Sequence, residues 1–178
     1  MTKSANWRLF DTVKFICDDN LGKLAAYLRI LGIDTAFDEN IDDPALLRKA
    51  AAEHRILLTR DHKMKNRSHP FGHLVLEMDG PLEQLSFVVK QLSVTINTDA
   101  IFSRCPKCNV LCETADKRSL EASLFPYILK THDIIKRCPS CGRFYWKGSH
   151  YKAILRKLKN ALGDDRISGK WPDASHQT

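Results

Sequence analysis

Four of the six cysteines form two short pairs whose spacing is typical of a metal site. Cys105 and Cys108 flank Pro-Lys, and Cys138 and Cys141 flank Pro-Ser. Each pair can present two thiolates across a tight turn, and two such turns supply the four sulfur ligands that tetrahedral zinc favours. Four cysteine ligands leave no coordination position open for a substrate, so we expect a structural zinc ion.

Aspartates follow the apolar runs of the N-terminal half, where they could hold a second kind of metal. Asp18 comes directly after VKFIC, Asp61 lies just beyond ILLT, and Asp43 precedes Pro44 at the start of a predicted helix. Carboxylates that converge on Mg²⁺ or Mn²⁺ can activate water for hydrolysis of a phosphodiester. Each aspartate could instead cap a helix or a turn. The pattern therefore permits a nuclease site but does not establish one.

The apolar pattern predicts alternating strands and helices, which would bring these aspartates to one edge of a sheet. Short apolar runs predict strands at 13–17, 33–37, 56–59 and 74–78. Apolar residues at helical spacing predict helices that begin near residues 21, 44 and 81. This alternation is typical of an α/β fold with a mostly parallel sheet covered on both faces. In such sheets the functional crevice lies beyond the carboxyl ends of the strands.

Composition changes near residue 100, and this change divides the chain into three predicted parts. We expect a catalytic domain over 1–100, a zinc ribbon with a basic helix over 101–162, and a flexible tail over 163–178. The interval between the two cysteine pairs leaves room for an insertion about one helix in size. Of the other cysteines, Cys17 in VKFIC is expected in the core, and Cys112 has no evident partner.

The net charge favours a polyanionic partner. The chain carries +7 at pH 7 with a pI of about 9.2, and basic residues crowd 136–159. Arg143, Lys147 and His150 alternate there with Tyr145 and Trp146, which suits contact with phosphates and stacking on unpaired bases. The aromatic residues could instead dock the ribbon onto the main domain. Because neither a membrane-spanning run nor a secretory signal is evident, we expect a cytoplasmic protein.

Four segments, in order, resemble the Mut-seven C-terminal RNase family: DDNLGKLAAYLRILGIDT, ILLTRD, the CPxC pairs and CGRFYWKGSHY. That family joins a PIN-like nuclease domain of three layers to a zinc ribbon, and the resemblance covers roughly 14–152. It implies Asp18, Asp43 and Asp61 as catalytic acids on a divalent cation, with the four cysteines as zinc ligands. PIN-like nucleases usually supply a further acid. Asp38 is our choice over its competitors Asp34, Glu39 and Asp42.

The resemblance also implies contacts with RNA. Lys23 and Arg29 would face phosphate or brace the acids, and Arg60, Lys147 and His150 are further candidates. We therefore expect a metal-dependent endoribonuclease that acts on single-stranded or looped RNA, and the charge distribution also permits transfer RNA. The alternative is a non-catalytic RNA-binding or adaptor protein whose aspartates are only caps. We favour the enzyme because carboxylates in a cleft would repel phosphate unless a cation lay between them.

Overall fold

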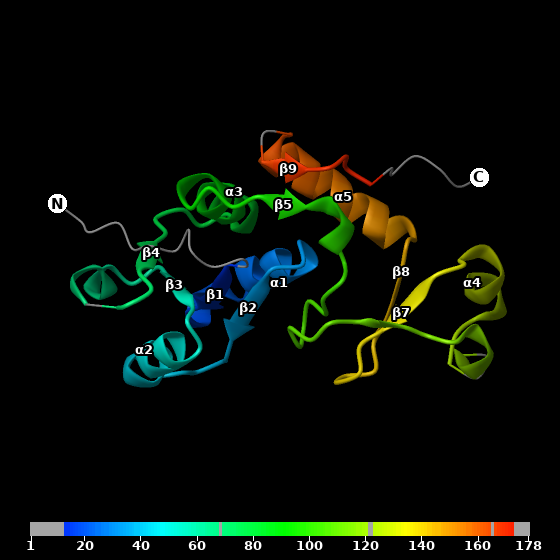
Figure 1. Ribbon diagram of the computed structural model, residues 1–178, viewed down its shortest axis with the longest axis horizontal. Helices are drawn as coiled ribbons and strands as arrows, with labels where there is room; N and C mark the ends of the chain where they lie inside the picture. Colours follow the sequence, from blue (N-terminus) through cyan, green and yellow to red (C-terminus); the bar gives the residue numbers. More distant parts are fainter. Residues whose placement is uncertain (1–12, 68, 121–122, 165, 173–178) are drawn as a thin grey trace.

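The short apolar runs of the N-terminal half form the strands of one parallel sheet (Figure 1). The structure is a computed structural model, and it describes residues 13–67, 69–120, 123–164 and 166–172. The strand order is β2-β1-β3-β4, and every neighbouring pair is parallel. The strands are β1 (Lys14–Cys17), β2 (Asp34–Phe37), β3 (Ile56–Thr59) and β4 (His73–Val75). The predicted parallel sheet is confirmed, although β4 ends earlier than the predicted residue 78.

Helices cover both faces of this sheet, because successive side chains along a strand point to opposite faces. Phe15 and Cys17 of β1 enter the larger core, whereas Ile16 enters a smaller core under one helix. The larger core is covered by α1 (Gly22–Ile30), α3 (Pro81–Gln91) and α5 (Ser149–Leu162), and the smaller one by α2 (Asp43–Ala52). This three-layer arrangement explains why the strands are almost continuously apolar.

The basic helix α5 belongs to the core of the α/β domain, which differs from the predicted division near residue 100. Its apolar residues recur at helical spacing and are buried in the larger core: Tyr151, Leu155, Leu158 and Leu162. The helix lies beside α3 (Figure 1). The segment predicted as one unit over 101–162 therefore consists of a ribbon followed by a helix that closes the α/β core.

The chain after α5 returns to the α/β domain, although the sequence predicts a flexible tail over 163–178. Strand β9 (Ile167–Ser168) pairs in parallel with β5 (Ile96–Asn97). The hydroxyl of Thr98 donates to the carbonyl of Ser168 at 3.2 Å, and Trp171 packs against the larger core. The structure thus differs from the tail prediction over 166–172, and residues 173–178 lie outside the described part of the chain.

A small antiparallel sheet in the order β6-β7-β8 carries the cysteine turns. Its strands are β6 (Glu113–Thr114), β7 (Ile135–Arg137) and β8 (Phe144–Trp146). The short helix α4 (Pro126–Thr131) lies between β6 and β7, in agreement with the predicted insertion. The described residues also form 3-10 helices: η2 (Asp19–Leu21), η3 (His62–Asn66), η4 (Thr98–Ala100) and η5 (Lys117–Leu120). None of the described helices has the length and apolar character that crossing a membrane requires.

Candidate functional site

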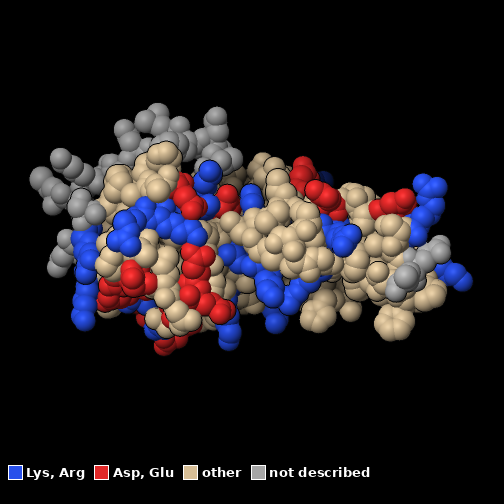
Figure 2. Space-filling view, turned by 90° about the horizontal axis from the view of Figure 1, so that it is seen from below, with Lys and Arg blue, Asp and Glu red and all other residues tan. Residues whose placement is uncertain are grey.

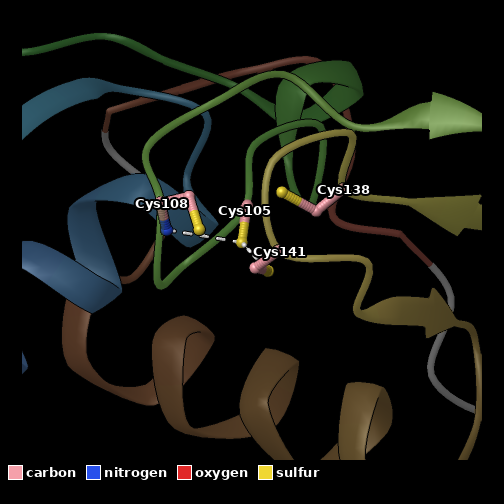
Figure 3. Close-up of side chains that lie close together, drawn as sticks. All are labelled: Cys105, Cys108, Cys138 and Cys141. Atoms are coloured by element: carbon pink, nitrogen blue, oxygen red, sulfur yellow. Dashed lines mark hydrogen bonds between the residues drawn. The ribbon is translucent and has the colours of Figure 1, made fainter.

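The two cysteine pairs face each other across the ribbon, with their side chains pointing toward a common centre (Figure 3). The Sγ atoms of Cys105, Cys108, Cys138 and Cys141 all lie within 4.8 Å of one another. The Sγ atoms of Cys105 and Cys141 are 3.8 Å apart. Tetrahedral zinc with Zn–S bonds of about 2.3 Å requires sulfur–sulfur distances of about 3.8 Å. The donor set and its geometry therefore fit one zinc ion.

The two turns that carry the cysteines have matching backbone structures. In each turn the amide of the fifth residue donates to the carbonyl of the first cysteine, Asn109 to Cys105 and Gly142 to Cys138, both at 3.0 Å. The fifth residues have positive φ, +64° at Asn109 and +72° at Gly142. Glycine adopts this conformation freely, and asparagine is among the side chains that tolerate it best. The repeated backbone geometry presents the two thiolate pairs in the same way.

A tyrosine on β8 contacts the first cysteine. The hydroxyl of Tyr145 lies 3.1 Å from Sγ of Cys105. Burial alone would raise the pKa of Cys105, but hydrogen bonds from Tyr145 and from the amides of Cys108 and Lys107 lower it to about 7. Burial also raises the pKa of Tyr145, which keeps its hydroxyl protonated as a donor. Because the thiolate is the form that binds metal, these hydrogen bonds prepare Cys105 as a ligand.

The first cysteine turn docks on the edge strand β2 through the side chain of Asn109. Its Oδ1 accepts from the amide of Thr35 at 3.0 Å, and its Nδ2 donates to Asp34 Oδ1 at 2.8 Å. The same oxygen of Asp34 accepts from Arg55 at 2.6 Å. Burial alone would raise the pKa of Asp34, but the hydrogen bonds from Arg55 and Asn109 lower it below its ordinary value. The ribbon thereby supplies a hydrogen-bond acceptor to the amide of Thr35, which points outward from the edge strand β2.

Arg29 lies in this interface, and only 5% of its surface is exposed. Its Nε donates to the carbonyl of Thr35 at 2.8 Å. Its Nη1 donates to the carbonyls of Pro106 at 3.0 Å and Lys107 at 2.8 Å, inside the first cysteine turn. The structure therefore corrects the prediction that Arg29 faces phosphate or braces the acids, because its guanidinium joins α1 and β2 to the ribbon.

Three of the predicted acids follow neighbouring strands at the carboxyl edge of the sheet. Asp38, Asp18 and Asp61 come after β2, β1 and β3. The fully buried Thr59, at the end of β3, connects two of these acids. Its hydroxyl donates to Asp18 Oδ2 at 2.7 Å and accepts from the amide of Asp61 at 3.0 Å. One hydroxyl thus fixes the orientation of the Asp18 carboxylate and the turn that carries Asp61.

Asp43 lies at the same edge, as the first residue of α2. The N-cap of this helix is Asp42, whose Oδ1 accepts from the amide of Ala45 at 2.6 Å. The capping role considered for Asp43 therefore belongs to its neighbour. The carboxylate of Asp43 lies in the first turn of the helix, where a negative charge interacts favourably with the helix dipole.

The carboxylate oxygens of the aspartates are not grouped as closely as the sulfur atoms of the four cysteines. Among the described residues, only the four cysteines form a group of three or more metal-ligating side chains with donor atoms within 4.8 Å. Asp38 pairs with Lys49 at 2.5 Å, and Asp61 Oδ1 accepts from the amide of Lys63 at 2.8 Å. A carboxylate can accept about four hydrogen bonds, so Asp18 and Asp61 keep free lone pairs. These hard oxygen donors match the ligand preference of Mg²⁺ or Mn²⁺.

The predicted RNA-contacting residues other than Arg29 fall into two groups. Lys23 is exposed in the first turn of α1, and Arg60 forms an ion pair with Asp79 beside the acidic edge. The second group is exposed on the ribbon and at the start of α5: Arg143, Lys147 and His150. Figure 2 shows acidic side chains gathered among basic ones over the α/β half of the molecule. Acidic and basic groups therefore share this face of the α/β half.

Sequence reasoning missed the roles of Thr59 and Asn109. Thr59 is the polar last residue of an otherwise apolar run, ILLT, and such a buried hydroxyl requires a partner. Asn109 has the position in the first cysteine turn that Gly142 has in the second. Aligning the two turns would have indicated its positive φ, but not the docking of its side chain on β2.

The family model of the Mut7-C RNAse domain matches residues 13–158 of the chain. The exonuclease mut-7 homolog of Homo sapiens is 27% identical to it over 169 residues. The aligned region covers 91% of this chain but 17% of the human protein, so the chain spans only a small part of that relative. No solved structure shows a significant match.

Proposed function

Because the chain belongs to the Mut7-C RNAse domain family, we propose that it is a metal-dependent endoribonuclease that hydrolyses phosphodiester bonds of RNA. The observation that best supports this activity is the pair of hydrogen bonds at Thr59. They join the carboxylate of Asp18 to the backbone amide of Asp61 at the carboxyl edge of the parallel sheet. This edge is where such folds usually carry their active sites. The net charge of +7 suits a polyanionic substrate.

In this proposal Asp18, Asp43 and Asp61 hold Mg²⁺ or Mn²⁺, and Asp38 completes the site. When bound, the cation supplies a water molecule of lowered pKa and neutralises charge on the scissile phosphate. Thr59 positions Asp18 by donating to one of its oxygens, which leaves the remaining lone pairs for the cation. The carboxylates also explain why a cation is needed, since alone they would repel the phosphate.

The basic residues would bind the RNA strand. Lys23 and Arg60 lie beside the acidic edge, and Arg143, Lys147 and His150 extend the contact onto the ribbon. The zinc ion would be structural, because four cysteine ligands leave no open position. The substrate that we propose is single-stranded or looped RNA, transfer RNA included, since sequence-specific proteins mostly contact RNA where its bases are unpaired.

The test is cleavage of labelled single-stranded and structured RNAs with Mg²⁺ or Mn²⁺. Asp18→Asn and Asp61→Asn should each lower the cleavage rate at least about a hundredfold, because each removes a charged ligand of the cation. Asp99→Asn is the matched control. Asp99 is an exposed aspartate in η4. This segment lies next to the C-terminal end of α1, whereas the acidic edge lies at its N-terminal end. This control should cleave at the wild-type rate at equal zinc content.

The alternative is a non-catalytic RNA-binding or adaptor protein. Two observations favour it. The aspartates of the described residues form no compact group of metal-ligating atoms, and the side chains of Asp18 and Asp61 cap η2 and η3. RNA binding without cleavage dependent on a divalent cation would support this alternative. Cleavage that remains unchanged in both Asp18→Asn and Asp61→Asn would remove the aspartates from catalysis.

A further inference from the structure

An aromatic pocket lies where the ribbon meets the α/β domain. Its volume is about 400 Å³, which is within the range of pockets that hold small organic groups. Its aromatic lining comes from the loop after η4, from β8 and from the start of α5: Phe102, Phe144, Tyr145, Trp146 and Tyr151. Flat aromatic walls of this kind suit a flat ring that can stack on them.

The backbone of Phe102 is strained where its ring lines this pocket. Its φ is +59°, a conformation that bulky residues rarely adopt. The amide of Phe102 donates to the carbonyl of Ile30 at 2.7 Å, and its ring lies 4.5 Å from that of Tyr151, centroid to centroid. Such strain persists only where the surrounding structure enforces it, and it is concentrated at ligand-binding sites. Here the hydrogen bond to Ile30 and the contact with Tyr151 hold the Phe102 ring in place as a wall of the pocket.

The rim of the pocket is cationic. Lys136, Lys147 and His150 line it, and its lining residues include no Asp or Glu. The first turn of α5 also begins at this rim without a side-chain cap, so its free backbone amides favour an anion. An aromatic wall beside a cationic rim matches a nucleotide, whose base is flat and whose phosphate is negative.

A second hollow lies along α1, on the side of the start of α3. It has a volume of about 600 Å³, and its lining includes Lys23, Tyr27, Ile30 and Glu83. Ile30 lines both hollows. From Lys23 to Ile30 the helix rises about 10 Å, which corresponds to about three nucleotides at a stacked spacing of about 3.4 Å.

We propose that the aromatic pocket binds one unpaired base of an RNA strand whose backbone follows α1 to the acidic edge. The path of the strand rests on the proposed function, whereas the occupancy of the pocket rests on its own aromatic and cationic lining. The bound base would then fix a distance of about three or more nucleotides to the bond that is cleaved. The segment between them must be single-stranded.

The experiment measures binding of a single-stranded RNA to the zinc-loaded full chain without Mg²⁺ or Mn²⁺, so that the RNA stays intact. Trp146→Ala should weaken binding about 5- to 100-fold, as loss of base stacking does. Phe125→Ala is the matched control, since Phe125 is a 78% exposed aromatic residue of the ribbon outside the pocket lining. It should change the affinity less than about twofold.

Gly148→Ala provides a second variant that keeps the tryptophan. A Cβ at this position would lie 2.8 Å from Nε1 of Trp146, so the indole ring or the backbone beside it must shift. This variant should also weaken RNA binding, although it adds only a methyl group. Zinc content and the helical circular dichroism signal of both variants identify any loss that comes from misfolding.

A scan with abasic nucleotides identifies the bound base. In the wild type one position should be sensitive, at a fixed distance from the cleaved bond, and in Trp146→Ala that sensitivity should vanish. Equal affinity at every position, or undiminished binding by zinc-loaded Trp146→Ala, would overturn the pocket inference even if the RNA is cleaved. Binding that depends on Trp146 without any cleavage would support the pocket and overturn the nuclease proposal.

Discussion

Thr59 is the residue whose environment most constrains the proposed active site. Its side chain is fully buried, yet both hydrogen-bonding functions of its hydroxyl are used, one by the carboxylate of Asp18 and one by the amide of Asp61. A buried hydroxyl without partners would be costly. The position therefore requires a hydroxyl for stability, and the same bonds orient an acid that we propose to be catalytic.

Thr59→Val tests this double role, because valine has nearly the same shape but no hydroxyl. We expect the free energy of unfolding to fall by about 1–3 kcal/mol, since the Asp18 carboxylate loses a donor and the partly buried amide of Asp61 loses its acceptor. The cleavage rate should fall by at least about tenfold as Asp18 loses its orientation. Thr59→Ser keeps the hydroxyl and should retain most of the activity. A loss of activity in Thr59→Ser but not in Thr59→Val would assign the effect to packing of the methyl group instead.

At the scale of elements, the contact between the first cysteine turn and β2 joins the two parts of the molecule. Asn109 combines a positive φ, which the turn requires, with a side chain that bonds to the sheet edge. Asn109→Gly separates these two functions, because glycine keeps the backbone conformation and loses the docking contacts. We expect unchanged zinc affinity, a loss of about 1–3 kcal/mol in stability, and faster hydrogen exchange at the amide of Thr35.

The matched control for this variant is Gly142→Asn in the second turn. A Cβ at Gly142 meets nothing within 4 Å, and asparagine tolerates its φ of +72°. This substitution should leave zinc affinity and the exchange of the Thr35 amide near their wild-type values. If Asn109→Gly instead lowered the zinc affinity, the side chain of Asn109 would stabilise the cysteine turn as well as dock it on β2.

The sequence allowed the central elements to be predicted because their signals are local. β1 and β3 are buried on both faces, so they read as continuous apolar runs, and the aspartates at their ends were placed correctly at one edge. The charge pattern predicted a basic helix at α5, but not that its apolar side chains enter the larger core. The two-residue strand β9 is too short to give a pattern. Likewise, a motif position could not reveal that Arg29 faces a neighbouring turn instead of the acidic edge.

At the scale of the whole molecule, zinc would support one wall of the aromatic pocket but not the core of the α/β domain. Tyr145 and Trp146 lie on β8, directly after the second cysteine turn, whereas Leu155 and Leu158 of α5 are buried in the larger core. The two hydrophobic cores of the sheet contain none of the four clustered cysteines. Loss of zinc should therefore disorder the ribbon while the parallel sheet and its helices remain folded.

This leads to a prediction for chelation of zinc in the wild-type protein. The helical circular dichroism signal should be largely retained, because α1, α2, α3 and α5 pack on the parallel sheet. RNA affinity should fall at least as much as in Trp146→Ala, since the β8 wall of the pocket is lost, and added zinc should restore it. Cys138→Ser should behave like the chelated protein but without rescue by zinc at low concentration. Cooperative loss of the entire helical signal on chelation would show instead that the ribbon and the α/β domain fold as one unit.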